Sequence, residues 1–285
     1  MASKDELEKL ARMEAEVKAG GGEKSVQKQH DSGKLTARER LGLLFDAGTF
    51  QEMDLFVQHR STNFGMDKVS IPADGVITGY GKVSGRTVCA YAQDFTARGG
   101  TLGEMHAKKI CRVMDMAMKM KVPMVGLIDS GGARIQEGIN ALDGYANIFF
   151  RNSCASGVIP QISAIMGPAA GGAVYSPAMT DFVFMVRKTS YMFITGPSVV
   201  KSVTGEEIGN DELGGAVTHS VKSGVAQFAC DNDEQTIEEI KKLLGYLPSS
   251  YEDKPPYVAP ADAPGRTDAT LDDIIPVSYT HLRAH

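Results

Sequence analysis

The first part of the chain has the apolar periodicity of helices. Within residues 4–18, apolar residues recur at helical spacing among charged ones, at Leu7, Leu10, Met13 and Val17. Glycines at 20–22 are the predicted end of this helix. A second helix is predicted to start at Thr36, because Thr36 and Glu39 have the spacing of a capping box and an apolar run follows. Gly48 is its predicted end.

After these helices the period changes to that of strands. Residues 75–83 and 86–93 are β-rich runs joined at Ser84-Gly85, which predicts a hairpin. Thr101 and Glu104 have capping-box spacing and predict the start of a helix. The apolar run at 124–128 lacks polar alternation, so we expect a strand that is buried on both faces.

Strands and helices then alternate along the chain. Further strands are predicted at 160–166, 181–186 and 190–194, and further helices at 141–151, from about 170–172, at 197–203 and at 236–246. This alternation predicts an α/β domain with a substantially parallel sheet.

Composition narrows the possible partners. The chain has 285 residues, 42% of them hydrophobic and 23% charged, which is typical of a globular protein with a sizeable core. Its formal net charge of -5 provides no general attraction for nucleic acid or an anionic membrane. Tryptophan is absent, which argues against base-stacking surfaces. We therefore expect no nucleic-acid partner.

The cysteines and histidines provide no metal-binding pattern. The four cysteines are far apart and form no C-x-x-C pair, which favours reduced thiols in a cytoplasmic protein. The histidines have no spacing typical of metal ligands, so no metal site is predicted. The charged N-terminus is unlike a signal peptide, and no apolar run approaches the ~18 residues of a membrane helix.

Two glycine-rich turns follow predicted buried strands. The first contains Gly131 and Gly132, and the second contains Gly171 and Gly172 at the start of a helix of small residues. Glycine lets a ligand approach the backbone, and the first N–H groups of a helix have no partner within it. Each turn alone also fits a purely structural role, as a strand-to-helix turn or as close helix–sheet packing.

Two such turns after neighbouring strands are more specific than one. An oxyanion hole needs two donors from separate segments, and this pair supplies them. The predicted donors are the backbone amides of Gly131, Gly132, Ala133, Gly171, Gly172 and Ala173.

Charged residues near the turns have two interpretations. Glu137 is either a general base or a partner of Arg134, and we favour the partner. Four basic residues either meet a phosphate-bearing ligand or form a solvated helix face, and we favour the solvated face: Arg98, Lys108, Lys109 and Arg112.

Six motifs that cover most of residues 20–250 carry a family resemblance. The chain resembles the N-terminal half of biotin-dependent acyl-CoA carboxyltransferases, nearest to propionyl-CoA carboxylase β subunits and methylmalonyl-CoA decarboxylase α subunits. The motifs are GKLTARERL at 33–41, TNFGMDK at 62–68, GGTLGEMHAKKI at 99–110, DSGGARIQEG at 129–138, GPAAGGAVYSPAMTDF at 167–182 and FITGPSVVKSVTGE at 193–206.

The resemblance implies a fold, substrates and partners. The implied fold is α/β, a crotonase-type (ClpP-like) ββα spiral with an N-terminal helical arm. This half would bind a CoA thioester, with Gly99, Gly100 and Arg134 as candidate contacts. Biotin would arrive on a carrier protein or domain, and a second domain of another subunit in a homo-oligomer would complete the active site. Biotin carboxylase or membrane decarboxylase subunits are the further implied partners.

The implied reaction is carboxyl transfer between carboxybiotin and a short-chain acyl-CoA through a thioester enolate. This chain would be the acyl-CoA half and is expected to be inactive alone. One alternative is a stand-alone crotonase-type hydratase or isomerase that uses Glu137. The other is a CoA-ester-binding fragment without catalysis. The sequence leaves carboxylase and sodium-pumping decarboxylase both open, so a location at the membrane surface is also open.

These inferences divide the chain into four parts. We expect a helical arm at 1–48, the acyl-CoA-binding domain at 49–248 and a Pro-, Asp- and Ala-rich linker at 249–276. The last residues, 277–285, break off from the family pattern, and we interpret them as a translated sequencing adapter, with an ordinary tail as the alternative. The natural protein is then expected to be about twice as long.

Overall fold

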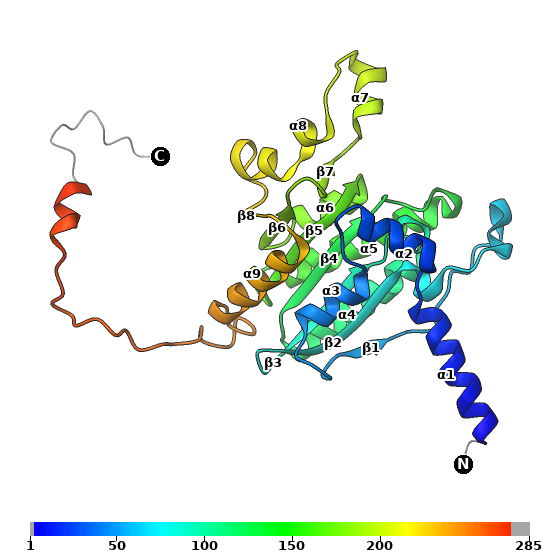
Figure 1. Ribbon diagram of the computed structural model, residues 1–285, viewed down its shortest axis with the longest axis horizontal. Helices are drawn as coiled ribbons and strands as arrows, with labels where there is room; N and C mark the ends of the chain where they lie inside the picture. The colour runs from blue at the N-terminus through cyan, green and yellow to red at the C-terminus, as the bar shows by residue number, and fades with distance from the viewer. Residues whose placement is uncertain (1–2, 275–285) are drawn as a thin grey trace. The chain divides into compact units, whose positions relative to one another are not determined.

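The computed structural model describes residues 3–274 and contains a mixed sheet with helices on both faces (Figure 1). Residues 3–255 belong to one compact unit, and residues 256–274 belong to a separate one. The strands are β1 Gln51–Met53, β2 Val76–Val83, β3 Arg86–Gln93, β4 Met124–Ser130, β5 Gln161–Ala170, β6 Phe182–Val186, β7 Tyr191–Phe193 and β8 Phe228–Cys230.

The sheet is antiparallel at one edge and parallel elsewhere. Its order is β1-β2-β3-β4-β5-β6-β8, and β7 pairs with the end of β5. The predicted hairpin between β2 and β3 is confirmed, with positive φ at Ser84 and Gly85 as a two-residue hairpin turn requires. From β3 onward neighbouring strands are parallel, so the predicted parallel sheet is confirmed there.

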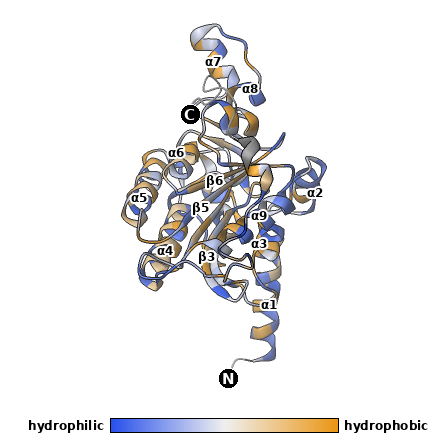
Figure 2. Ribbon diagram, turned by 90° about the vertical axis from the view of Figure 1, so that its left-hand side faces the viewer, coloured by the Kyte–Doolittle hydropathy of each residue, from blue (hydrophilic) through white to orange (hydrophobic). Residues whose placement is uncertain are grey.

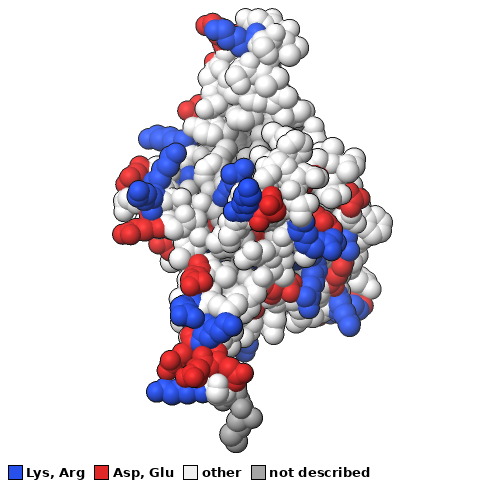
Figure 3. Space-filling model, turned by 90° about the vertical axis from the view of Figure 1, so that its right-hand side faces the viewer, with Lys and Arg blue, Asp and Glu red and all other residues white. Residues whose placement is uncertain are grey.

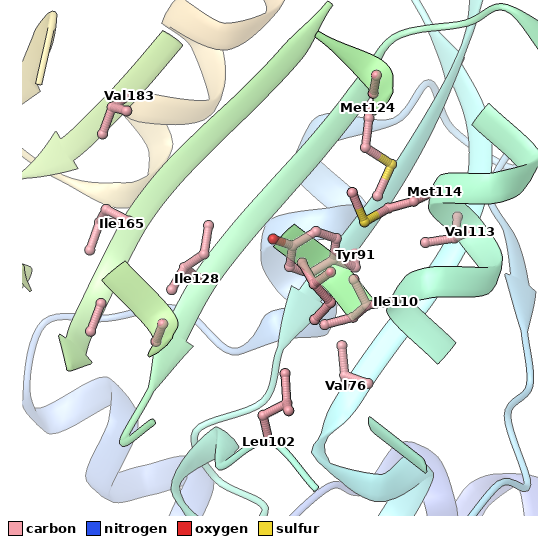
Figure 4. Close-up of a cluster of buried hydrophobic side chains, with 14 of the residues drawn as sticks. Val76, Tyr91, Leu102, Ile110, Val113, Met114, Met124, Ile128, Ile165 and Val183 are labelled. Carbon is pink, nitrogen blue, oxygen red and sulfur yellow. The ribbon is translucent and has the colours of Figure 1, made fainter. Parts of the chain in front are cut away.

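Helices cover the two faces of the sheet separately (Figure 2). They are α1 Lys4–Lys18, α2 Glu23–Asp31, α3 Ala37–Leu44, α4 Glu104–Met120, α5 Ile139–Ala155, α6 Gly172–Ala178, α7 Pro197–Thr204, α8 Asn210–Gly214 and α9 Asp233–Tyr246. One buried cluster joins α4, α5 and α6 to the sheet, and Figure 4 shows part of it, including Ile110, Ile128 and Ile165. A second cluster joins α3 and α9 to the opposite face, through residues such as Leu41 and Ile240.

The helix starts show where local patterns suffice and where they fail. Thr36 caps α3 with the predicted capping box, but the helix ends at Leu44, before the predicted Gly48. The capping box predicted at Thr101 is wrong, because the Thr101 hydroxyl donates to the Arg98 carbonyl. The α2 segment was not predicted, because it is almost wholly polar and so has no apolar period.

Arg40 of α3 fixes the N-terminal helices to the body of the protein. Its side chain is fully buried, and its guanidinium donates to three acceptors. Arg40 Nη1 lies 2.9 Å from Asp129 Oδ2, and Arg40 Nε lies 2.7 Å from Asp233 Oδ2. Arg40 Nη2 lies 2.7 Å from the Met166 carbonyl oxygen. One side chain therefore joins α3, β4, β5 and α9.

Asp129 is the centre of this buried network. Its carboxylate also accepts from Lys34, at 3.1 Å to both oxygens, and from Gln29 at 2.9 Å. A Cβ atom on Gly167 would collide with the same carboxylate, so glycine is required there. Burial disfavours the charged form of Arg40, but Asp129 and the second carboxylate outweigh that effect and raise its pKa.

We predict that Arg40→Met lowers the free energy of unfolding by about 3–5 kcal/mol, because it leaves Asp129 and Asp233 buried without their main cation. Urea unfolding followed by circular dichroism measures the loss. The control is Arg187→Met, which breaks the exposed Arg187–Asp231 pair and should cost less than about 1 kcal/mol. Equal losses in the two variants would contradict the assigned role of Arg40.

The described C-terminal residues and the surface of the protein contribute little to the position of the turns. Within residues 3–274 no helix is both long enough and apolar enough to cross a membrane. Residues 251–271 are exposed, and a 3-10 turn spans Ala269–Ile274. The segment 277–285, interpreted as adapter-derived, lies outside the described residues. On the face shown in Figure 3, acidic and basic side chains are interspersed.

Candidate active site

The two glycine turns lie side by side at the carboxyl ends of β4 and β5. These strands are parallel neighbours, and Ser130 pairs with Ala169 at their ends. A Cβ atom on Gly132 would lie 2.9 Å from the Ala170 carbonyl oxygen, so the two turns are in backbone contact. Gly132 and Gly171 both have positive φ, at 94° and 56°, which glycine adopts without strain.

The first turn leaves one amide of the three without an acceptor. Gly131 N donates to the Gly99 carbonyl at 3.0 Å, and Gly132 N donates to Ser130 Oγ at 3.1 Å. The expectation that these two amides are free is therefore corrected, because other parts of the chain already use them. Ala133 is half-buried, and its N–H has no acceptor among residues 3–274.

The second turn leaves two amides that have no acceptor within residues 3–274. Gly171 N donates to the Phe193 carbonyl at 3.3 Å, which continues the pairing of β5 with β7. Gly172 and Ala173 are the first residues of α6, where N–H groups have no partner within the helix. Gly172 is half-buried and Ala173 is 4% exposed. The structure therefore reduces the six predicted donors to Ala133, Gly172 and Ala173.

Gly99 and Gly100 support the first turn. They end the 3-10 turn Arg98–Gly100, which follows β3. The Gly99 carbonyl accepts from Gly131, and the Gly100 carbonyl accepts from Ser130 Oγ at 2.7 Å. Gly100 has a φ of 58°, and a Cβ atom there would collide with the backbone of β4. Gly100 is thus needed for the close approach of this loop to the turn, whereas Gly99 is favoured by its positive φ of 66°.

Arg134 is buried and points away from any external ligand. Its Nη1 lies 2.6 Å from Asp74 Oδ1 and 2.7 Å from Glu137 Oε1, and its Nη2 lies 2.8 Å from the Thr101 carbonyl. The side chain has 0% exposure. The expectation that Arg134 contacts acyl-CoA is therefore corrected, since its guanidinium is engaged by internal acceptors.

Glu137 is also internal, as the favoured interpretation predicted. Its side chain is 3% exposed and pairs with Arg134. Its second oxygen accepts from the Glu104 amide at 2.7 Å and so caps α4 in place of Thr101. Gly103 makes room for it, because a Cβ atom there would collide with the carboxylate. Glu137 therefore has no free oxygen for proton transfer to a ligand.

One of the four basic residues near α4 is buried rather than solvated. Lys109 is 2% exposed and donates to the Ala73 and Val76 carbonyl oxygens, at 2.8 and 2.5 Å. The preference for a solvated face is wrong for this residue. Its position, four residues before the buried Val113, is the sequence signal that places it on the inner face. Lys108 remains exposed, at 57%.

A cavity of about 480 Å³ lies beside the first turn. It is formed by α2, the loop after β3, the end of β5 and the turn between β6 and β7. Its lining has lysines, hydroxyl groups and aromatic rings: Ser25, Lys28, Gln29, Ser32, Lys34, Phe95, Thr96, Gly99, Pro168, Lys188, Thr189 and Tyr191. Because these residues come from four separate segments, the sequence pattern alone did not identify them.

Two features of this cavity connect it to the turns. Gly99 lines the cavity and its carbonyl holds the Gly131 amide. Lys34 also lines it, lies 4.3 Å from the centre of the Phe95 ring and binds Asp129, close to the end of β4. A second cavity of about 420 Å³ lies between α4 and α5 and contains no residue of either turn.

No metal centre is found in the described part of the chain. Among residues 3–274, no group of three or more His, Cys, Asp or Glu side chains is arranged to hold a metal ion.

The buried Lys109 predicts a pH dependence of stability. Burial lowers its pKa from 10.5 to about 8. Between these values the unfolded chain keeps a proton that the folded chain has released, so a rise in pH favours the folded state. We predict that Lys109→Met removes this contribution. The difference in free energy of unfolding between wild type and variant should then change by up to about 1.4 kcal/mol per pH unit.

Urea unfolding at several pH values from 8 to 10.5 measures this difference. Lys108→Met is the matched control, because it removes the neighbouring exposed lysine. Parallel pH profiles for wild type and Lys109→Met would show that Lys109 does not titrate in this window.

Comparison with known proteins connects this site to a family. Residues 28–281 match the carboxyl transferase domain family. The chain is 58% identical to the α subunit of methylmalonyl-CoA decarboxylase from Veillonella parvula, over 95% of this chain and 53% of that protein. It is 56% identical to the carboxyltransferase subunit of propionyl-CoA carboxylase from Haloferax mediterranei, over 97% of this chain and 54% of that protein. The chain thus spans about half the length of the curated relatives it matches.

A solved structure supports the same relationship. The crystal structure of the transcarboxylase 12S hexamer, with methylmalonyl-CoA and methylmalonic acid bound, matches with a TM-score of 0.93 and 48% identity, over 98% of this chain and 55% of that chain. This similarity confirms the expected α/β, crotonase-type fold.

Proposed function

This chain belongs to the carboxyl transferase domain family, and we propose that it is the acyl-CoA-binding half of a biotin-dependent acyl-CoA carboxyltransferase. The single observation that carries the proposal is the contact between the two glycine turns. Among the described residues, the Ala133 amide on one side and the Gly172 amide on the other have no acceptor. The expected substrates are short-chain acyl-CoA esters of the propionyl-CoA and methylmalonyl-CoA type, which the names of the relatives support.

The proposed chemistry follows from the charge that these amides face. Loss of the proton next to a thioester carbonyl produces an enolate, and its negative charge gathers on the carbonyl oxygen. Preorganised N–H groups at that oxygen stabilise the charge, by about 3–4 kcal/mol for each well-placed donor. Ala133 and Gly172 are the proposed donors, and Ala173 supports the second one from the same helix start.

Backbone amides are suited to hold a carbonyl oxygen, and no side chain of the site is assigned as the base. Glu137 is occupied by Arg134 and by the start of α4, which argues against a hydratase or isomerase that relies on it. When bound, carboxybiotin on its carrier would supply the carboxyl group, and the ureido nitrogen freed by loss of that group is the proposed proton acceptor. The role of this chain is to orient the thioester and stabilise the enolate oxygen.

The cavity beside Gly99 is the proposed place for the phosphate-bearing part of CoA. Lys28, Lys34 and Lys188 line it, and phosphate groups favour such cationic surroundings. Gly99 borders both this cavity and the first turn, so the two parts of the proposed site share this residue. Gly99 and Gly100 thus stay in the proposal as CoA-binding elements.

The proposed assembly is larger than this chain. The transcarboxylase to which the chain is similar is a hexamer. We propose a homo-oligomer in which a second domain of another subunit completes the site, with a biotin carrier and with either biotin carboxylase or membrane decarboxylase subunits. The expected location of the assembly is the cytoplasm. A fragment that binds CoA esters without transfer is the second candidate, because the chain spans about half of its relatives.

Ligand binding tests the proposal directly. Isothermal titration calorimetry of this chain with propionyl-CoA should show saturable binding. Free CoA should bind more weakly, since it lacks the thioester oxygen that the amides hold. Equal affinity for both ligands would contradict the proposed role of the amides, and binding of neither would contradict the whole assignment.

We predict that Gly172→Ala weakens propionyl-CoA binding by up to about tenfold, the effect of losing one neutral hydrogen bond to the ester carbonyl. The added methyl group would lie 2.7 Å from the Tyr145 ring and would displace the start of α6. Gly245→Ala is the matched control, because a methyl group there meets open space on α9. The same calorimetric titration compares both variants, and unchanged binding by Gly172→Ala would contradict the assigned donor.

A further inference from the structure

Tyr145 of α5 lies directly behind the second turn. A Cβ atom on Gly172 would lie 2.7 Å from the Cγ and Cδ2 atoms of its ring, so the ring packs against the first residue of α6. Ala173, the next residue, belongs to the same buried cluster as Tyr145. The position of the start of α6 is therefore set by this aromatic ring.

The buried side chain of Ser130 holds the first turn by two hydrogen bonds. This side chain is fully buried, accepts from Gly132 N at 3.1 Å and donates to the Gly100 carbonyl at 2.7 Å. Burial raises the pKa of the Tyr145 phenol, and the nearby Ser130 hydroxyl opposes that rise. Ser130 pairs with Ala169 at the ends of β4 and β5, so the hydroxyl that organises the first turn lies beside the strand that leads into the second.

A small cavity beside Tyr145 is lined by two residues, Tyr145 and Gln93, that each have a polar atom without a partner in the described part of the chain. Its volume is about 10 Å³, and its lining includes Tyr91, Gln93, Tyr145, Ala173 and Ser176. Tyr145 Oη and Gln93 Oε1 have no hydrogen-bond partner among residues 3–274, although their residues are only 5% and 3% exposed. Buried polar atoms are rarely left unsatisfied, because the loss of their hydration is costly.

We propose that this cavity holds one ordered water molecule. The volume is about that of one water-sized probe, and a buried water needs at least two polar partners, which this site supplies. The Tyr145 hydroxyl donates to the water oxygen, and the water donates to Gln93 Oε1. The water and Tyr145 together form a positioning unit that sets the separation of the two turns. The relevance of this separation to catalysis rests on the proposed function, but the water site itself does not.

A high-resolution crystal structure of this chain tests the water site. The expected result is one density peak within hydrogen-bonding distance of both Tyr145 Oη and Gln93 Oε1. An empty cavity between well-ordered side chains would overturn the proposal. The experiment needs no CoA ester, so its outcome is independent of the calorimetric test of the proposed function.

Amide hydrogen exchange, resolved by NMR, tests the positioning role. Tyr145→Phe keeps the ring but removes the hydroxyl. It should raise the exchange rates of two hydrogen-bonded amides, Gly132 in the first turn and Gly171 in the second, by about fivefold, the factor for one ordinary hydrogen bond. Tyr145→Leu also removes the ring and should give a larger increase in both turns.

Tyr175→Phe is the matched control, because it removes the hydroxyl of a half-exposed tyrosine on α6 itself. Unchanged exchange in Tyr145→Phe, or a change confined to one turn, would overturn the positioning role. If Tyr145→Leu does not fold, Tyr145→Phe still decides the question, because its ring retains the packing against Gly172.

Discussion

The fold depends on a buried network in which two cations face two anions. Lys34 and Arg40 come from the N-terminal segment, Asp129 from β4 and Asp233 from α9, and all are almost completely buried. A buried charge without its partner is strongly unfavourable, so the network constrains all of these elements at once. The N-terminal helices are therefore structural parts of the sheet end that carries the turns, and α3 is as much a core helix as α9.

Local patterns in the sequence are sufficient to predict most of the helices and strands. They are insufficient to predict which side chains of these elements contact one another. The strands around Ser84-Gly85 and the helix after Thr36 follow from spacing that is visible within a few residues. The true cap of α4 is Glu137, which lies 33 residues away. Arg40 and Asp233 are 193 residues apart, and no local pattern reports such a pair. The α2 segment was missed because its position depends on contacts such as that of Gln29 with Asp129, rather than on an apolar stripe.

At the site, too, local features can be predicted from the sequence and long-range contacts cannot. Glycine residues mark the turns directly in the sequence, so the pair of turns was predictable. Which amides remain available was not, because the acceptors for Gly131 and Gly132 are Gly99 and Ser130, and their approach depends on the folded loop after β3. Arg134 was misassigned for a similar reason. Its partner Asp74 lies 60 residues away in a segment with no recognisable motif.

The sequence distance within the buried network also sets an order of assembly during synthesis. Arg40 leaves the ribosome 193 residues ahead of Asp233. Until α9 is made, Lys34 and Arg40 have only Asp129 to face, which leaves one positive charge in excess, and the sheet face that α9 covers stays open to water. The nascent chain therefore completes its core late, and chains that stop before α9 would expose an apolar surface that chaperones recognise.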